Sequence, residues 1–261
     1  MDVFKLALVD NTPFQFIASC IQRACGDLIL EDVRVHDLIT KNSIPTRIWD
    51  FIYSRLHLKA TQSNGRFEAV IVKRGPWEMI LLLDTVTGLL FSIMREERYK
   101  QLCMESPESR RFHYARCLAG EFNSELPPLA KQIKLPGIDD SYEQAVIEKI
   151  VTSMLDSSGF PTDLIKHHAL VLFSARDFEV QSIRCVMVDR DFDIIEQVSW
   201  NNLLLLTESV VSDTVNEQDS PHDNPTRGLK LTPKAMKKQE QQLLKYQKDN
   251  QNTITIGQQG E

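Results

Sequence analysis

The chain has 261 residues, of which 42% are hydrophobic and 25% are charged, and its formal net charge is −6. This composition is ordinary for a globular protein, and it excludes a collagen-like chain, a wholly disordered chain and a protein with a uniformly basic surface. Any contact with nucleic acid therefore needs a local cationic patch. No apolar run approaches the roughly 18 residues that a membrane span requires, so no membrane contact is expected.

The cysteines and the first residues indicate a compartment. Five cysteines are scattered without a C-x-x-C pair, which favours free thiols in a reducing environment over a disulfide framework or a zinc site. The apolar run at residues 6–9 ends in a polar turn at residues 10–13 and is too short for the core of a signal peptide. Together these features predict a cytoplasmic protein.

Two amphipathic helices are predicted in the first 65 residues. Thr12 as the N-cap and Pro13 at the first helical position are typical of a helix start, and an apolar face continues to Gly26, which is expected to end the helix. A second helix is predicted to begin near Pro45, with an apolar stripe at helical spacing, and to end before Gly65.

The hydrophobic period then changes from helical to alternating. Residues 67–72, 77–85 and 89–94 are rich in branched and aromatic side chains and are separated by turn sequences, which predicts three antiparallel strands. The middle strand is apolar on both faces, so both faces are expected to be covered. Helices are predicted to follow at residues 95–102 and 109–122.

The second half of the chain repeats this order of elements. After a connector rich in proline, a capping sequence and an apolar stripe predict an amphipathic helix at residues 141–155 that packs on a sheet. Three further strands are predicted at residues 169–174, 180–188 and 194–200. A degenerate internal duplication and a single sheet made from both groups of strands are both compatible with this order.

The predicted fold class is therefore α+β: two three-stranded antiparallel meanders, forming one mixed sheet or two small sheets, flanked by helices. The globular body is expected to span residues 1–210. Its division into two subdomains, 1–125 and 138–210, is the alternative. Residues 211–261 are polar and are predicted to be a disordered tail, because they bury too little apolar surface to offset the ordering entropy. A short basic helix at residues 233–249 could fold on a partner, although a solvated extension is the favoured interpretation.

One enzymatic hypothesis follows from the order of elements. Helix, three antiparallel strands, helix and strand is the order found in restriction-endonuclease-like folds, which cleave phosphodiesters with metal-bound carboxylates and a lysine. Asp84 ends the second predicted strand, but residues 90–94 carry neither a carboxylate nor a lysine. An intact nuclease site is therefore disfavoured. A divergent metal-dependent nuclease that uses Asp84 is kept as the alternative function.

Other familiar catalytic or metal sites are not predicted. His113 and Cys117 would share a face of the predicted helix at 109–122, but no orienting group or oxyanion donor is evident, so a buried thiol near a ring is favoured. His167 and His168 are expected to face opposite sides of a strand, which disfavours a shared metal ion. The sequence contains no glycine-rich phosphate loop and no common hydrolase motif. We therefore predict no catalytic residues, no metal and no cofactor.

The leading hypothesis is a binding surface around one hairpin. Lys73 and Arg74 lie at a predicted hairpin tip beside Trp77, where cations could contact phosphate and the indole could stack on a base. An ordinary charged turn would look the same. Arg47 and Arg95 could add to this surface if the fold brings them to the same side. The sequence thus predicts a non-enzymatic binding or regulatory protein that engages a protein or a nucleic acid.

Several short motifs resemble an uncharacterised bacterial and phage family of unknown function. The motifs are IPTR at 44–47, WDFI at 49–52, KRGPWE at 73–78, SIMRE at 92–96, a His-Tyr pair at 113–114 and a tryptophan at 200. The resemblance extends along most of the body and is not expected to include the tail. It implies an intracellular bacterial protein linked to mobile elements or phage defence, and it brings no catalytic residues to this sequence.

Overall fold

The computed structural model describes most of the chain as far as residue 204. The described residues are 4–37, 39–74, 76–126, 141–156, 159 and 161–204, with side chains described for all except residues 74 and 141–143. The predicted tail at 211–261, its helix at 233–249 and the proline-rich connector after residue 126 lie outside the described residues.

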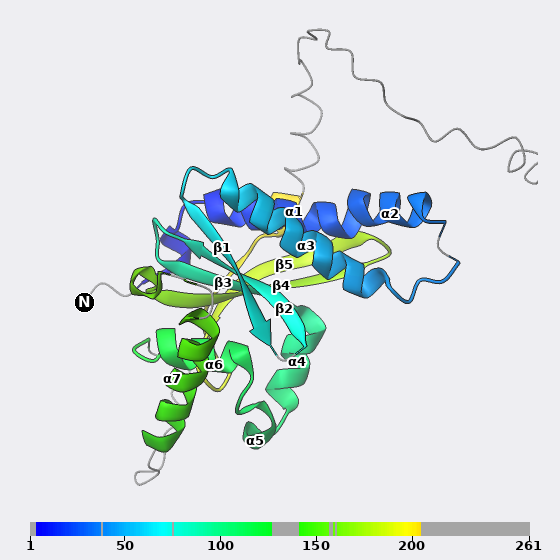
Figure 1. Cartoon of the computed structure of the whole chain (residues 1–261). Coiled ribbons are helices and arrows are strands. Elements are labelled where there is room, and N and C mark those ends of the chain that lie inside the picture. Colours follow the sequence, from blue (N-terminus) through cyan, green and yellow to red (C-terminus); the bar gives the residue numbers. More distant parts are fainter. Residues whose placement is uncertain are drawn as a thin grey trace, which may run out of the picture. The chain divides into compact units, whose positions relative to one another are not determined.

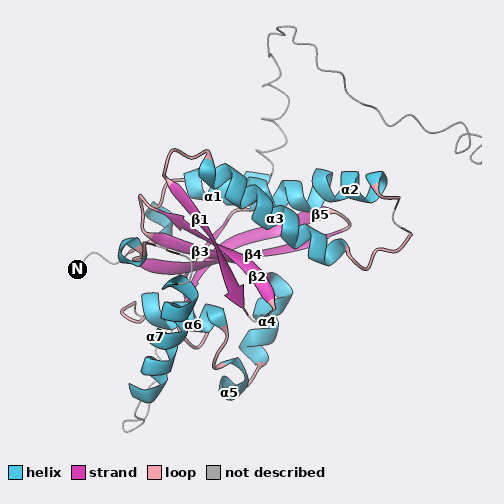
Figure 2. Cartoon of the chain, viewed as in Figure 1, coloured by secondary structure: helices cyan, strands magenta, loops and turns pink. Residues whose placement is uncertain are grey.

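The described residues contain six β-strands in one mixed sheet (Figure 2). The strands are β1 (Phe67–Arg74), β2 (Trp77–Asp84), β3 (Leu89–Arg95), β4 (His167–Arg176), β5 (Glu179–Val188) and β6 (Ile194–Ser199). They lie in the sheet in sequence order, and every neighbouring pair is antiparallel except β3 and β4, which are parallel. The two predicted meanders are therefore halves of a single sheet, which decides between the one-sheet and two-sheet alternatives.

Helices connect and cover the two halves (Figure 1). A parallel pair requires a long crossover, and the chain between β3 and β4 supplies it with helices. The helical elements are η1 (Leu6–Leu8), α1 (Thr12–Arg23), η2 (Ala24–Leu28), α2 (Ile29–Val35), α3 (Ile44–Thr61), α4 (Glu96–Met104), α5 (Pro107–Arg110), α6 (Tyr114–Phe122), α7 (Ser141–Asp156) and η3 (Thr162–Leu164). None of the described helices is long and apolar enough to cross a membrane.

The sheet separates two hydrophobic cores. Side chains alternate along each strand, so Phe91 and Ile93 of β3 join the core beneath α1 and α3, whereas Leu90 and Met94 join the core beneath α4, α6 and α7. The predicted helix at 141–155 is confirmed as α7, and its buried Ile147 belongs to the second core. The middle strand β2 is covered on both faces, as its apolar sequence predicted.

Two predictions about the first helix are wrong. Asn11, not Thr12, is the N-cap, and the amide of Thr12 donates to the carboxylate of Asp10 at 2.8 Å. Gly26 does not end the helix: the chain continues through the π-helical turn η2 into α2, with a kink at Gly26 (φ −101°, ψ −105°). The buried Cys25 and Ile29 on either side keep the helical segment against the core, which explains why it continues.

The predicted helix at 109–122 is also wrong, because α5 and α6 are separate helices. His113 between them is extended, and its Nδ1 accepts a hydrogen bond from the amide of Ala115 as the N-cap of α6. His113 is therefore the N-cap that precedes α6, whereas the sequence predicted that it lies within one helix together with Cys117. Instead the amide of Cys117 donates to the backbone carbonyl of His113 at 3.0 Å.

Candidate functional site

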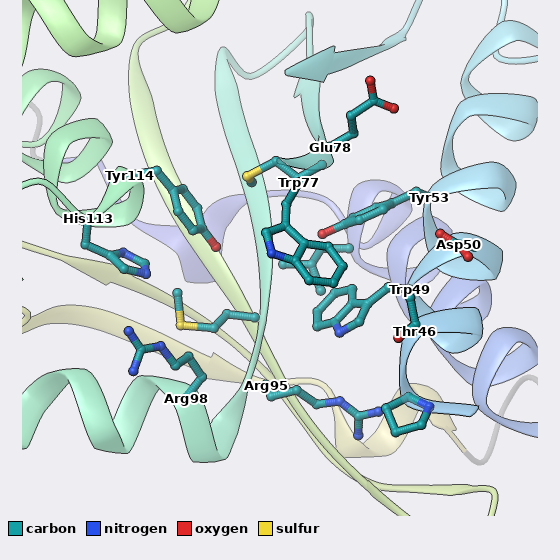
Figure 3. A pocket seen from close by; sticks show the side chains of 14 residues that line it. Thr46, Trp49, Asp50, Tyr53, Trp77, Glu78, Arg95, Arg98, His113 and Tyr114 are labelled. Carbon is teal, nitrogen blue, oxygen red and sulfur yellow. The ribbon is translucent and has the colours of Figure 1, made fainter. Parts of the chain in front are cut away.

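A cavity of about 470 Å³ opens between α3, the β1–β2 hairpin, the end of β3 and the start of α6 (Figure 3). Ligand-binding cavities usually measure about 300–1,000 Å³, so this one is large enough for a small molecule or for one unit of a polymer. Two tryptophans, two tyrosines and a histidine line it, together with two arginines and two acids. A cavity with so many rings has a face for a flat ligand and charged groups to orient it.

Helix α3 supplies the floor of this cavity. Trp49 and Tyr53 are four residues apart, so they lie on the same face of the helix, and their rings are stacked at 5.5 Å between centroids. Trp49 also meets Phe173 of β4 edge to face at 5.6 Å. These contacts with a neighbouring helix turn and with the sheet hold the Trp49 indole in place.

The Trp77 side chain forms the mouth of the cavity. Trp77 is the first residue of β2, and 65% of its surface is exposed. Figure 3 shows its indole between Tyr53 and Trp49 on one side and Tyr114 on the other. Trp77 stacks on no ring among the described residues, so a large aromatic face is open to a ligand.

The wall formed by α6 is mostly buried. His113 and Tyr114 are only 6% and 7% exposed, and their rings lie 4.7 Å apart. His113 also contacts the ring of Phe192. Because His113 caps the helix, its position and that of the adjacent Tyr114 are fixed by the start of α6.

Two arginines of different character reach the cavity. The guanidinium of Arg98 donates to the carboxylate of Glu105 at 2.7 Å, so its charge is largely satisfied within the protein. The guanidinium of Arg95 lies 4.5 Å from the centre of the Phe173 ring. Among the residues that the structure describes, Arg95 has no ion pair and no side-chain hydrogen bond, so its donors are open to an anion.

Two carboxylates lie at the rim. Asp50 is on the exposed side of α3, and the side chain of Glu78 on β2 is 62% exposed. The Glu78 carboxylate lies 4.0 Å from the ammonium group of Lys73 across the hairpin. The cavity therefore offers acceptors at its rim as well as the open cation of Arg95.

The structure brings together only part of the predicted surface. Trp77 and Arg95 both line the cavity, so one indole and one cation of the predicted surface belong to the same site. Arg47 forms an ion pair with Asp32 of α2 and does not line the cavity. Lys73 is exposed and pairs with Glu78 rather than entering the cavity. The Arg74 side chain lies outside the described side chains.

Sequence reasoning missed the residues that complete the cavity. Trp49 is part of the apolar stripe predicted for the helix that begins near Pro45, and its neighbour Tyr53 was not singled out. Arg98 and Tyr114 come from elements whose approach depends on how the sheet is assembled. One signal was present: Trp49 and Tyr53 are large amphipathic rings at the edge of the α3 stripe, where part of each ring stays exposed.

Asp84, the acid of the alternative nuclease hypothesis, lies at the other end of β2. It is fully buried and accepts hydrogen bonds from Arg66 Nε at 3.2 Å and from the Thr87 hydroxyl at 2.8 Å. These contacts close the β2–β3 turn. The described residues contain no group of three His, Cys, Asp or Glu side chains that could hold a metal ion.

His167 and His168, which the sequence analysis disfavoured as shared metal ligands, differ in burial, because His168 lies in the interior and His167 is partly exposed. His168 is fully buried, and its Nε2 lies 2.9 Å from the Ser92 hydroxyl. Burial lowers the pKa of His168 to about 3, so the ring is neutral at physiological pH. His167 contacts the carbonyl of Phe122 through Nδ1 and lies against the ring of Phe4. Both histidines therefore have structural contacts of their own.

Comparison with known proteins places the chain in one family. A family model described as "Family of unknown function (DUF5986)" matches residues 7–246. The match extends beyond residue 211, so the expectation that the resemblance excludes the tail is wrong. No curated protein and no solved structure matches the chain.

Proposed function

The chain belongs to this family of unknown function, DUF5986, and from the geometry of its cavity we propose a non-enzymatic protein that binds single-stranded nucleic acid. An unpaired base lies against the open indole of Trp77, and a neighbouring phosphate contacts Arg95. The observation that carries the proposal is the meeting of an exposed indole, a stacked Trp49–Tyr53 pair and an open arginine in one cavity.

Stacking supports an unpaired base as the ligand. Every base presents a flat π face, and stacking on an aromatic side chain contributes about 1–3 kcal/mol per base. Trp77 has its face open, and Trp49 behind it is already held by Tyr53 and Phe173. A base can therefore gain the contact without any rearrangement of the floor.

Charge supports a phosphate next to the base. The planar guanidinium of arginine matches the oxygens of a phosphate and can donate two hydrogen bonds to it. Arg95 is oriented by Phe173 and has no ion pair among the described residues, so it need not exchange one partner for another. Carboxylates such as Asp50 and Glu78 accept hydrogen bonds from amino groups on base edges, which would favour adenine, cytosine or guanine over thymine or uracil.

Binding of a fluorescein-labelled single-stranded oligonucleotide of mixed sequence, followed by fluorescence anisotropy, tests the proposal. The wild-type protein is expected to bind saturably and to lose affinity with added salt, and Trp77→Ala and Arg95→Ala are each expected to weaken binding about tenfold or more. Phe112→Ala is the matched aromatic control, because Phe112 is 60% exposed and does not line the cavity. Arg23→Ala is the matched control for charge, because Arg23 is exposed and pairs with Asp27.

A protein partner is the second candidate, and the observation that favours it is the pair of carboxylates at an aromatic rim. Asp50 and Glu78 could receive a lysine or arginine of a partner while the rings bind its side chain by cation–π contact. If a lysine-rich peptide does not displace the labelled oligonucleotide from the protein, nucleic acid remains the proposed ligand. Binding of that peptide, with no binding of the oligonucleotide, would replace nucleic acid by protein in the proposal.

The setting in the cell is part of this proposal. The family resemblance favours a bacterial protein carried by mobile elements or active in phage defence, and free thiols favour the cytoplasm. Single-stranded nucleic acid is exposed during phage replication and element transfer. The genes that neighbour this one provide the test: a replication, transfer or defence cassette supports the setting, and housekeeping metabolic genes contradict it.

A further inference from the structure

A second cavity, of about 270 Å³, adjoins the first and shares Pro45 and Arg95 with it. It lies between the start of α3, the kinked segment η2 and the β4–β5 hairpin. The two cavities therefore meet at Pro45 and Arg95. A ligand that occupies the first cavity and extends past Arg95 enters the second.

The second cavity is the more cationic of the two. It is lined by Lys41, Arg95 and Arg176 against a single carboxylate, Asp177, which lies 3.5 Å from Arg176 Nε, so that Lys41 and Arg95 make up the excess of positive charge. The first cavity has two arginines against two carboxylates, so its charges balance. In a chain whose net charge is −6, a local excess of positive charge is a distinct feature. Phosphate groups therefore have a more favourable environment on the far side of Arg95 than within the first cavity.

Arg95 lies at the boundary itself. It is the last residue of β3, and its guanidinium rests on the buried Phe173 ring at 4.5 Å. This contact holds the charged group between the cavities while its N–H groups remain open to a ligand. A phosphate that joins two units, one in each cavity, would meet these donors.

The second cavity also has an aromatic ring in an unusual place. Asp177 and Phe178 form the two-residue turn of the β4–β5 hairpin, with φ of 50° and 67°. Turns of this type favour Asn and Gly, and a bulky residue with positive φ is strained. Phe178 nevertheless occupies the position, lines the cavity, and has the Lys41 ammonium 5.9 Å from its ring centre. Part of its ring packs on the core and part remains exposed. Backbone strain kept at such a position is typical of functional sites.

We infer that the ligand is a strand of at least two consecutive nucleotides, with one base in the first cavity, the linking phosphate at Arg95 and the next nucleotide in the second cavity against Phe178. This inference rests on the proposed function and deepens it. It distinguishes a strand from a free nucleotide with several phosphates, because a polyphosphate would use Lys41 and Arg176 but would not need the Phe178 ring.

Competition against the labelled oligonucleotide tests the inference, with a mononucleotide, a dinucleotide, a tetranucleotide and a nucleoside triphosphate as unlabelled ligands. The dinucleotide is expected to bind about tenfold more tightly than the mononucleotide, because a second base gains a stacking contact. Lys41→Ala, Arg176→Ala and Phe178→Asn are expected to weaken the dinucleotide several-fold and to leave the mononucleotide unchanged. Asparagine is used at 178 because it tolerates positive φ, so the turn is kept.

The outcomes separate the two proposals. Equal affinity for the mononucleotide and the dinucleotide, or full dinucleotide binding by Phe178→Asn, overturns the strand inference while mononucleotide binding still supports the proposed function. A triphosphate that binds as tightly as the dinucleotide and is insensitive to Phe178→Asn overturns it in favour of a polyphosphate. Failure of every ligand to bind the wild-type protein overturns both.

Discussion

The two ends of strand β2 differ in how their side chains are satisfied. At one end, Asp84 is fully buried and is held by Arg66 and Thr87. At the other end, Trp77 exposes 65% of its surface and stacks on no described ring. A buried group whose partners all belong to the protein stabilises the fold, whereas an exposed group that lacks them is available to a ligand. The difference supports a structural role for the Asp84 end and agrees with the binding role proposed for the Trp77 end.

The largest expected effect, a loss of stability, comes from removing the buried carboxylate of Asp84. Asp84→Ala leaves the Arg66 guanidinium without one of its carboxylate partners and removes the acceptor for Thr87. We expect the free energy of unfolding to fall by about 3 kcal/mol, measured by urea denaturation. Oligonucleotide binding at low temperature is expected to be unchanged. Cleavage of plasmid DNA with Mg²⁺ by the wild type, lost in Asp84→Asn, would instead favour the nuclease alternative.

The open end is expected to respond in the opposite way. Trp77→Ala should weaken oligonucleotide binding by about 2 kcal/mol through the lost stack. Its free energy of unfolding should change by no more than about 0.5 kcal/mol, because the side chain is mostly outside the core. Denaturation and anisotropy measured on the same preparation check both values. A variant that unfolds easily but still binds would reverse the assignment.

The pH dependence of stability is a second test of the buried end of the sheet. There, His168 of β4 lies opposite Leu90 of β3 in the register of the two strands. An unfolded histidine takes up a proton below about pH 6.5, whereas burial keeps His168 neutral in the fold down to about pH 3. Between these values the unfolded state binds more protons, so the free energy of unfolding falls by about 1.4 kcal/mol per pH unit as pH decreases. Urea denaturation from pH 7 to pH 4 should show a shallower slope in His168→Gln.

The wild type and His168→Gln must therefore differ most at the acidic end of that range. Parallel pH profiles for the two proteins would show that His168 titrates normally in the fold. The binding proposed at Trp77 does not involve His168, so the oligonucleotide affinity at neutral pH serves as the control.

The smallest expected effect is at Lys73, which the sequence placed in the binding surface. Lys73 is 79% exposed, lies 4.0 Å from Glu78 and does not line the cavity. Lys73→Ala should lower oligonucleotide affinity no more than about twofold, through the long-range attraction alone, and the difference should vanish at high salt. A tenfold loss would mean that the ligand runs along the hairpin tip rather than into the cavity.

Local pattern explains why the elements were predictable. The alternation along residues 67–94 and the capping sequence at the start of α7 each depend on a few neighbouring residues, and the structure has strands and a helix there. The one-sheet alternative could not be chosen, because it depends on the parallel pairing of Leu89 with His167, 78 positions later in the chain. The kink at Gly26 was missed because packing of Cys25 and Ile29 outweighs the local stop signal.

The candidate site was predictable only in part for the same reason. Trp77 and Arg95 stood out because an indole and a cation near a turn are informative on their own. Arg47 carries the same charge, but its pairing with Asp32 depends on how α2 and α3 pack. Trp49 and Tyr114 become cavity residues only when α3 and α6 approach the same end of the sheet.

The most direct measurement follows the indole N–H signals of the three tryptophans by ¹⁵N NMR during titration with a single-stranded oligonucleotide. Trp49 and Trp77 line the cavity, whereas Trp200 is 1% exposed and stacks on Phe14. If nucleic acid binds in the cavity, the signals of Trp77 and Trp49 shift saturably and that of Trp200 does not. Signals that stay unchanged at all three tryptophans, or a shift confined to Trp200, would contradict this proposal.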